Sequence, residues 1–382
     1  MLPLTILLLF RQRTGSFAEA GIAVAVSGLA AVAGGPVTAR LADRHGPHVL
    51  AVAGAVNAAS LVLLAVTASP EVSWIAVAAA GLSVPPLTAA LRATITVGLT
   101  TESDRAAAFS LDAITTELLF VAGPALVSAA AVLGGTADAL FAASGLVVTG
   151  SALIARAAAR TVRQPVPAAQ VRDSSHSHVG QAALLAPWLV IGSAQMAAIG
   201  FVEVAATARV IHLGDSAAAG TVLAVWAVGS MTGGLIYGGR DWPGPATGQL
   251  RVLLLLLAAG YAIVSAAGNM AALCPLMFAA GLACAPAATA LTTSFSAYAN
   301  RTESFAWLAS ATSLGGSAGY AAGGYLVAHD PLTAAFLVGA ALAVVAAAIV
   351  PRTRPLAIDH LMPAAEKEEN KHVPSTRFGH TR

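Results

Sequence analysis

The chain has 382 residues, of which 57% are hydrophobic and only 10% are charged, and its formal net charge is +2. Soluble domains carry about 25% charged residues, so this chain cannot cover a water-facing surface and is predicted to be a polytopic membrane protein. Its mean hydropathy of +0.77 points to the same class.

The apolar runs predict twelve membrane helices joined by short polar turns. The first run, 1–10, would reach only about 15 Å, half of the hydrocarbon thickness, before Arg11 and Arg13 end it. We expect it to be either a half-span or, as we favour, part of a helix that starts further upstream. The other eleven helices are expected at 18–39, 48–68, 73–99, 109–133, 137–155, 182–210, 216–238, 250–267, 270–298, 305–328 and 331–350.

Two polar segments interrupt this pattern. Residues 156–181 are rich in arginine, proline, serine and histidine, and we predict a flexible cytoplasmic linker between an N-terminal bundle (1–155) and a C-terminal bundle (182–350). Residues 351–382 have no apolar period and predict a disordered cytoplasmic tail. We interpret the histidines of the linker as solvated side chains, and we predict no metal site and no cofactor.

The two halves repeat one another at an offset near 200 residues. Three pairs of segments share sequence at this spacing: AAGLSVPPLTAAL with AAGLACAPAATAL (79–91 and 279–291), AGPALV with AGGYLV (122–127 and 322–327), and TES with TES (101–103 and 302–304). Six helices per repeat leave both copies in the same orientation, because six is even. The sequence therefore predicts an all-α membrane protein of two six-helix bundles related by a parallel repeat, with a short first helix and a substrate cavity between the bundles.

One stretch between the second and third predicted helices concentrates charge. GGPVTARLADRHGPHVL, at 34–50, brings Arg40, Asp43 and Arg44 together and turns at Gly46. We interpret it as a tight basic hairpin in which small residues allow close helix packing and the glycine takes a positive φ. An ordinary arginine-rich loop on the cytoplasmic side is the alternative.

The pattern G-P-x-x-A-R-L-A-D-R-x-G in this stretch resembles the loop between the second and third helices of the major facilitator superfamily, a family of twelve-helix secondary transporters. The resemblance extends over residues 1–350 and implies alternating access, with this loop as a cytoplasmic gate. After the glycine the family usually has one or two basic residues, whereas this chain has Pro47 and His48. The gate residues implied by the resemblance are Gly35, Arg40, Asp43, Arg44 and Gly46.

Polar side chains at membrane depth are candidates for transport chemistry because they are costly in lipid. Arg92 and Glu117 lie at similar depth on consecutive helices, so we predict that they pair, either as a cavity-floor ion pair that substrate or a proton breaks, or as a structural bridge. Glu203 has no basic neighbour on its own helix face and is a candidate proton carrier, or else a carboxyl group facing water near the outer mouth. Asn57 and Gln195 are expected to bind substrate or to join helices.

Other polar and helix-breaking residues have expected roles in the helices. We interpret Asp112 as a residue near a helix N-terminus, where the dipole favours an acid. Gly123-Pro124 loosely resembles the antiporter motif of drug exporters within the superfamily, which favours export by proton antiport. Kinks are predicted at Pro85, Pro86, Gly123, Pro124 and Pro286.

Arginine asymmetry between the predicted loops places the linker and the tail in the cytoplasm. We therefore predict a monomeric secondary transporter of the cytoplasmic membrane that exports a small solute with proton coupling. Its expected partners are the solute, protons and lipid, and no nucleic acid. A proton-coupled importer, a non-transporting or truncated membrane sensor, and an embedded enzyme are the alternatives, although the histidines lie in loops, at helix ends or in the tail. The absence of a G-x-x-x-x-G-K-[ST] segment disfavours an ATP-driven pump.

Overall fold

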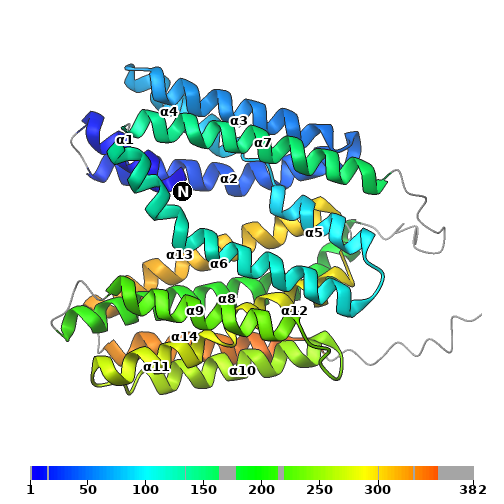
Figure 1. The fold of residues 1–382 in the computed structure, drawn as a ribbon, viewed down its shortest axis with the longest axis vertical. Helices are drawn as coiled ribbons and strands as arrows, with labels where there is room; N and C mark the ends of the chain where they lie inside the picture. The colour runs from blue at the N-terminus through cyan, green and yellow to red at the C-terminus, as the bar shows by residue number, and fades with distance from the viewer. Residues whose placement is uncertain are drawn as a thin grey trace, which may run out of the picture. The chain divides into compact units, whose positions relative to one another are not determined.

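The computed structural model describes residues 2–14, 17–133, 135–162, 178–213, 219–299, 301–329 and 332–351. Over these ranges every regular element is an α-helix, and most of the helices run along one common direction (Figure 1). A helix satisfies its own backbone hydrogen bonds, as a chain in lipid requires. Residues 1–350 form one unit and 351–382 another. Apart from Pro351, the predicted tail lies outside the described residues.

Seven helices make up the described part of the N-terminal half. They are α1 (Leu2–Thr14), α2 (Phe17–His45), α3 (His48–Val66), α4 (Pro70–Leu82), α5 (Leu87–Gly98), α6 (Glu102–Leu133) and α7 (Thr136–Val162). Seven more make up the described part of the C-terminal half. They are α8 (His178–His212), α9 (Ala219–Gly238), α10 (Ala246–Val264), α11 (Met270–Gly281), α12 (Cys284–Ser296), α13 (Thr302–His329) and α14 (Leu332–Ile349).

Two of the predicted membrane helices are divided, so the fourteen described helices correspond to the twelve predicted segments. The fourth segment becomes α4 and α5, which are separated at Pro85-Pro86, and the tenth becomes α11 and α12, with Pro286 in the first turn of α12. Proline is tolerated in a first turn because the missing N–H has no partner there. Nine stretches of the described chain are long and apolar enough to cross a membrane. The predicted all-helical membrane fold is confirmed.

The charged hairpin differs from its predicted form. Helix α2 continues to His45, so Arg40, Asp43 and Arg44 lie on its last two turns and not in a loop. Nothing between Pro36 and Gly46 breaks the helix, and Gly46 then ends it with a φ of 105°, a conformation that costs glycine little. The turn itself is therefore only Gly46-Pro47, which fixes the direction of the charged side chains.

Other helices are longer than the hydropathy predicts. Helix α6 begins at Glu102 and not at residue 109, and α7 continues to Val162. Because α8 begins at His178, helices enter the predicted linker from both ends. The rest of the linker, 163–177, lies outside the described residues. Amphipathic helix ends that project beyond the lipid carry charges, which is why a hydropathy pattern alone ends them too early.

The internal repeat is visible in the packing of glycines. A Cβ on Gly34 of α2 would collide with the backbone carbonyl of Leu82, at the end of α4. A Cβ on Gly233 of α9 would collide in the same way with the carbonyl of Leu282, just after α11. Gly35, by contrast, faces open space. The close approach of α2 to α4 is thus repeated by α9 and α11, as small residues at helix interfaces allow.

Two arginines on the side away from the hairpin follow the same repeat. Arg13, near the end of α1, donates to the carbonyl oxygen of Leu64 at 2.9 Å, at the end of α3. Arg209, near the end of α8, donates to the carbonyl oxygens of Ser265 at 3.1 Å and of Ala267, just beyond α10. Helix C-termini leave carbonyl groups unpaired and attract cations. These arginines therefore have a structural role on the side where arginine asymmetry predicts few.

The glycine contacts generate a stability prediction. Gly34→Ala and Gly233→Ala should each lower the stability by about 1–3 kcal/mol, because backbone must move to admit the methyl group. Thermal unfolding of the purified protein in detergent measures this. Gly28→Ala is the matched control in α2, because nothing lies within 4 Å of its added Cβ. Equal melting temperatures for all three variants would show that the close approach is not needed.

Candidate functional site

The end of α2 is joined to the start of α13 through one carboxylate. Asp43 accepts hydrogen bonds from the backbone N–H groups of Thr302 at 3.1 Å and Glu303 at 2.8 Å. The first N–H groups of a helix have no partner within the helix, and the helix dipole favours an anion there. Arg40 lies 4.0 Å from the carboxylate of Glu303, an exposed contact that adds little stability. Arg44 is exposed at the same helix end.

A second connection through an aspartate joins the end of α9 to the start of α6. The hydroxyl of Ser103 donates to the carboxylate of Asp241, in the turn after α9. The carboxylate of Glu102 accepts from the backbone N–H of Ala246 at 3.1 Å, at the start of α10. Each TES segment is therefore held by an aspartate of the other half. The end of α9 lacks the charged sequence pattern of 34–50, but an aspartate there contacts the other half as Asp43 does.

Two serines extend these connections toward the middle of the helices. Ser110 of α6 donates to the carbonyl oxygen of Gly234 in α9. Ser310 of α13 donates to the carbonyl oxygen of Val32 in α2 at 3.1 Å. The two serines are 200 positions apart and so occupy equivalent places in the repeat. All of these contacts between the halves lie toward the hairpin end of the helices, so the structure is closed on that side.

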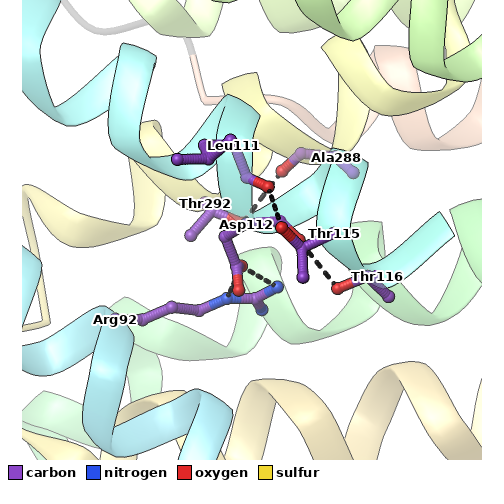
Figure 2. Close-up of polar contacts among 7 residues, drawn as sticks. All are labelled: Arg92, Leu111, Asp112, Thr115, Thr116, Ala288 and Thr292. Carbon is purple, nitrogen blue, oxygen red and sulfur yellow. Dashed lines mark hydrogen bonds and ion pairs between the residues drawn. The ribbon is translucent and has the colours of Figure 1, made fainter. Parts of the chain in front are cut away.

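Arg92 pairs with an aspartate, Asp112, which the sequence did not predict as its partner. Its Nε and Nη2 atoms each lie 2.7 Å from one carboxylate oxygen of Asp112, as Figure 2 shows. The side chain of Arg92 is 20% exposed and that of Asp112 is 9% exposed, so the pair is largely buried. Because α6 begins at Glu102, Asp112 lies three turns inside the helix at the depth of Arg92, which corrects its interpretation as a residue near a helix N-terminus. The side chain of Glu117 lies outside the described residues.

The threonines around this pair donate their hydroxyl groups to carbonyl oxygens of their own helices. The hydroxyl of Thr116 donates to the carbonyl oxygen of Asp112 at 2.9 Å, and that of Thr115 donates to its own helix (Figure 2). Thr292 of α12, the repeat counterpart of Arg92, donates to the carbonyl oxygen of Ala288 at 2.9 Å. The position equivalent to Arg92 in the second half therefore carries no charge. Gly123 and Pro124 lie further along α6, where the side chains are outside the described residues.

Asn57 donates a hydrogen bond at the break between α4 and α5. Because Val84 donates to Gly81, the carbonyl oxygen of Ala80 loses its usual partner four residues on. The Nδ2 group of Asn57, a fully buried residue of α3, donates to that oxygen at 2.6 Å. This contact joins helices, while the Oδ1 atom of Asn57 has no hydrogen-bond partner among the described residues, so substrate binding stays a prediction. Unpaired backbone groups are costly in lipid, which gives the amide a physical reason to be there.

Gln195 of α8 is 3% exposed, and its Oε1 atom has no hydrogen-bond partner among the described residues. The same holds for the hydroxyl groups of Thr289, Thr293 and Ser294 in α12, a helix that is buried over nearly its whole length. A buried polar atom without a partner costs about 1–3 kcal/mol. Such groups are candidates to bind a polar solute or water. Gln195 is a candidate from the sequence, whereas the three hydroxyl groups, which lie in the run TALTTSFS, were not predicted.

Glu203 lies in the part of α8 furthest from the hairpin. It accepts a hydrogen bond from the hydroxyl of Tyr320 in α13. Both residues line a cleft of about 340 Å³ together with Thr207 and four apolar residues. Arg209, the nearest base in sequence, donates instead to carbonyl groups and lies over the ring of Phe336, 5.6 Å from its centre. Glu203 thus has no ion-pair partner among the described residues.

The family model described as Major Facilitator Superfamily matches residues 1–246 of the chain. The chain belongs to the major facilitator superfamily. Membership makes it a multi-pass membrane protein and a secondary transporter of small molecules rather than an enzyme. The resemblance drawn from the 34–50 stretch is thereby confirmed. A search of curated protein sequences finds no match to the chain.

Solved structures of the superfamily share its fold at low identity. The human organic anion transporter MFSD10 (TETRAN) is 16% identical, with a TM-score of 0.67 over 86% of this chain and 83% of that one. The E. coli fucose:proton symporter FucP is 15% identical, with a TM-score of 0.64 over 92% and 97%. The proton:xylose symporter XylE is 14% identical, with a TM-score of 0.68 over 91% of each chain. These similarities establish the fold.

The Asp43 contact generates a conformational prediction for this superfamily member. Asp43→Ala should weaken closure on the hairpin side by about 1–2 kcal/mol, because the N-terminus of α13 loses its cap. Spin labels at His48 and Arg301, in a background without Cys274 and Cys284, should then show a larger share of long distances. Asp43→Asn, which keeps an acceptor oxygen, should show a smaller shift. An unchanged distance distribution in Asp43→Ala would contradict the assignment.

The buried ion pair generates a separate prediction. Asp112→Asn should cost about 3–5 kcal/mol of stability, because it leaves the guanidinium of Arg92 buried without a counter-charge. The double variant Arg92→Met with Asp112→Leu should be closer to the wild type than Asp112→Asn, because it buries no charge. Thermal unfolding of the purified variants tests the order. A double variant less stable than Asp112→Asn would contradict the pairing.

Proposed function

We propose that this transporter exports a small solute across the cytoplasmic membrane by alternating access, in exchange for protons. The observation that carries the proposal is the paired set of contacts at the hairpin side, in which Asp43 and Asp241 each reach a TES segment of the other half. These contacts are polar, partly exposed and limited to helix ends. They can therefore break and reform without disturbing the packing inside either bundle.

The gate residues have distinct roles in this proposal. Asp43 is the latch, Gly46 fixes the direction of the last turn of α2, and Arg40 supports Glu303. Gly35, which faces open space in this closed state, is available for closer packing when the bundles rock to the opposite state. Arg44, exposed at the helix end, has the charge expected of a cytoplasmic residue. We accordingly assign the hairpin, the linker and the tail to the cytoplasm, and the active unit to a monomer.

Glu203 is the proposed proton carrier. It lies at membrane depth, contacts a phenol and has no basic partner among the described residues, so protonation can neutralise it. Glu117 remains a second candidate from the sequence. Arg92 and Asp112 neutralise one another, and they are proposed to support the cavity floor where α5 meets α6. Gln195 is proposed to bind the solute, because its unpaired Oε1 atom can accept a hydrogen bond from it.

Proton-coupled import is the second candidate. FucP and XylE, which share the fold, are named as proton symporters. Export is preferred here because Glu203 supplies a carboxyl group to the cleft and no basic residue of the described chain lines it. A solute and a proton that use the same acid exclude one another, as exchange requires.

Reconstituted transport tests the proposal. Proteoliposomes containing a trapped pH indicator are given an imposed pH gradient and a panel of neutral, cationic and anionic aromatic solutes. We expect at least one solute to move protons in the opposite direction, and Glu203→Gln to abolish that coupling. Glu117→Gln, tested in parallel, distinguishes the two acids. Full coupling in both variants would remove both as proton carriers, and protons moving with the solute would establish import.

A further inference from the structure

The cleft at Glu203 is lined by three helices of the C-terminal half. Its residues are Glu203, Val204, Thr207, Ala208 and Ile211 of α8, Leu223 of α9 and Tyr320 of α13. Helix α9 also packs against α6, and α13 packs against α2 and α5. The lining residues of α8 belong to the part of that helix furthest from the hairpin, so the cleft lies on the side away from the closed contacts. Figure 1 shows α8 beside α9 and α13.

Glu203 is the one residue with a charged side chain among the described residues that line the cleft. Thr207 is its other polar residue on α8, and its hydroxyl is already used by the carbonyl oxygen of Glu203 at 2.8 Å. The neighbouring helices α9, α12 and α14 contain no charged residue. Helix α13 has only Glu303 and His329, close to its two ends. On α8 itself Arg209 is held by carbonyl groups, and the histidines lie at the helix ends.

The remaining surface favours an apolar body carrying one positive charge. Four of the seven lining residues are aliphatic, and Tyr320 is 46% exposed. A cation is attracted both to a carboxylate of low solvation and to the face of an aromatic ring. An anion would meet the carboxylate without a compensating base, and a neutral solute would leave the carboxylate unpaired. The volume of about 340 Å³ matches a small aromatic amine.

We infer that this cleft binds organic monocations with an apolar body, and that such a cation and a proton compete for the carboxylate of Glu203. The inference rests on the proposed function and deepens it by naming the substrate class. The phenol of Tyr320 holds the carboxylate in place while leaving its second oxygen for the cation. Competition for one acid couples cation release to protonation, which converts a proton gradient into export.

The test is a binding measurement on the full-length protein in detergent, which needs no transport. The probe is benzyltrimethylammonium, whose charge does not depend on pH. Its neutral isostere 2,2-dimethylpropylbenzene has the same shape, and benzoate supplies the opposite charge. We expect saturable binding of the cation alone, an affinity that falls as the pH is lowered, and release of protons into a weakly buffered solution as the cation binds.

Three variants localise the binding. Glu203→Gln should lose about tenfold or more in affinity and should abolish the pH dependence. Tyr320→Phe should lose less, because it keeps the ring and removes only the hydrogen bond. Glu71→Gln, an acid in the N-terminal half, is the matched control and should bind as the wild type does. Melting temperatures verify that each variant is folded, and Glu203→Asp, which keeps the charge, should retain the preference for the cation.

Equal binding of the cation and its neutral isostere, preference for benzoate, or unchanged affinity in a folded Glu203→Gln variant would each overturn the inference. The proposed function fails separately. Cation binding without proton-coupled flux would leave the inference standing and refute the exporter, whereas coupled flux of neutral solutes without cation binding would do the reverse.

Discussion

The arrangement of the two halves depends on acid side chains that meet the unpaired N–H groups at helix N-termini. Asp43 at the start of α13 is the clearest case, with two backbone donors at 2.8 and 3.1 Å. Such a contact is strong enough to select one state and weak enough to be broken, because it lies at an exposed helix end where water competes. A transporter needs this property at its gate. The other TES segment is joined to the opposite half by the hydroxyl of Ser103, which donates to Asp241, and by Glu102, which accepts from the N–H of Ala246 at the start of α10.

The buried polar residues have two different kinds of role. Asn57 donates to a carbonyl group released by the break before Pro85, and Arg13 and Arg209 donate to carbonyl groups at helix ends. These residues replace backbone hydrogen bonds that the fold leaves unmade. Within the described chain, Asn57 and Arg209 each keep one unpaired atom beside the bonds they make, and Gln195 and three hydroxyl groups of α12 have unpaired atoms as well. The carboxylate of Glu203 accepts from a phenol. Unpaired groups of this kind are the natural positions for solute and proton chemistry.

The ion pair of Arg92 shows how a small error in a helix boundary changes a site. Hydropathy places the start of the fifth segment at residue 109, because the preceding turns carry charges. With the start at Glu102, the residue level with Arg92 is Asp112 and not Glu117. The helix and the chemistry were predictable, but the contact with Asp112 was not. Depth in the membrane depends on where a helix begins, and charged residues extend helices beyond the apolar run.

The sequence by itself determines the membrane class, the twelve segments, the repeat and the superfamily, since apolar periods and the pattern at 34–50 are local properties of the chain. It also indicates which acids and amides lie at membrane depth. Only the tertiary structure decides the contacts between residues far apart in sequence: Asp43 with α13, Asp241 with Ser103, and Glu203 with Tyr320. The physical reason is that helix spacing and rotation set these distances, and they arise from packing such as that of Gly34 against Leu82. A pattern in one helix cannot specify the face that another helix presents to it.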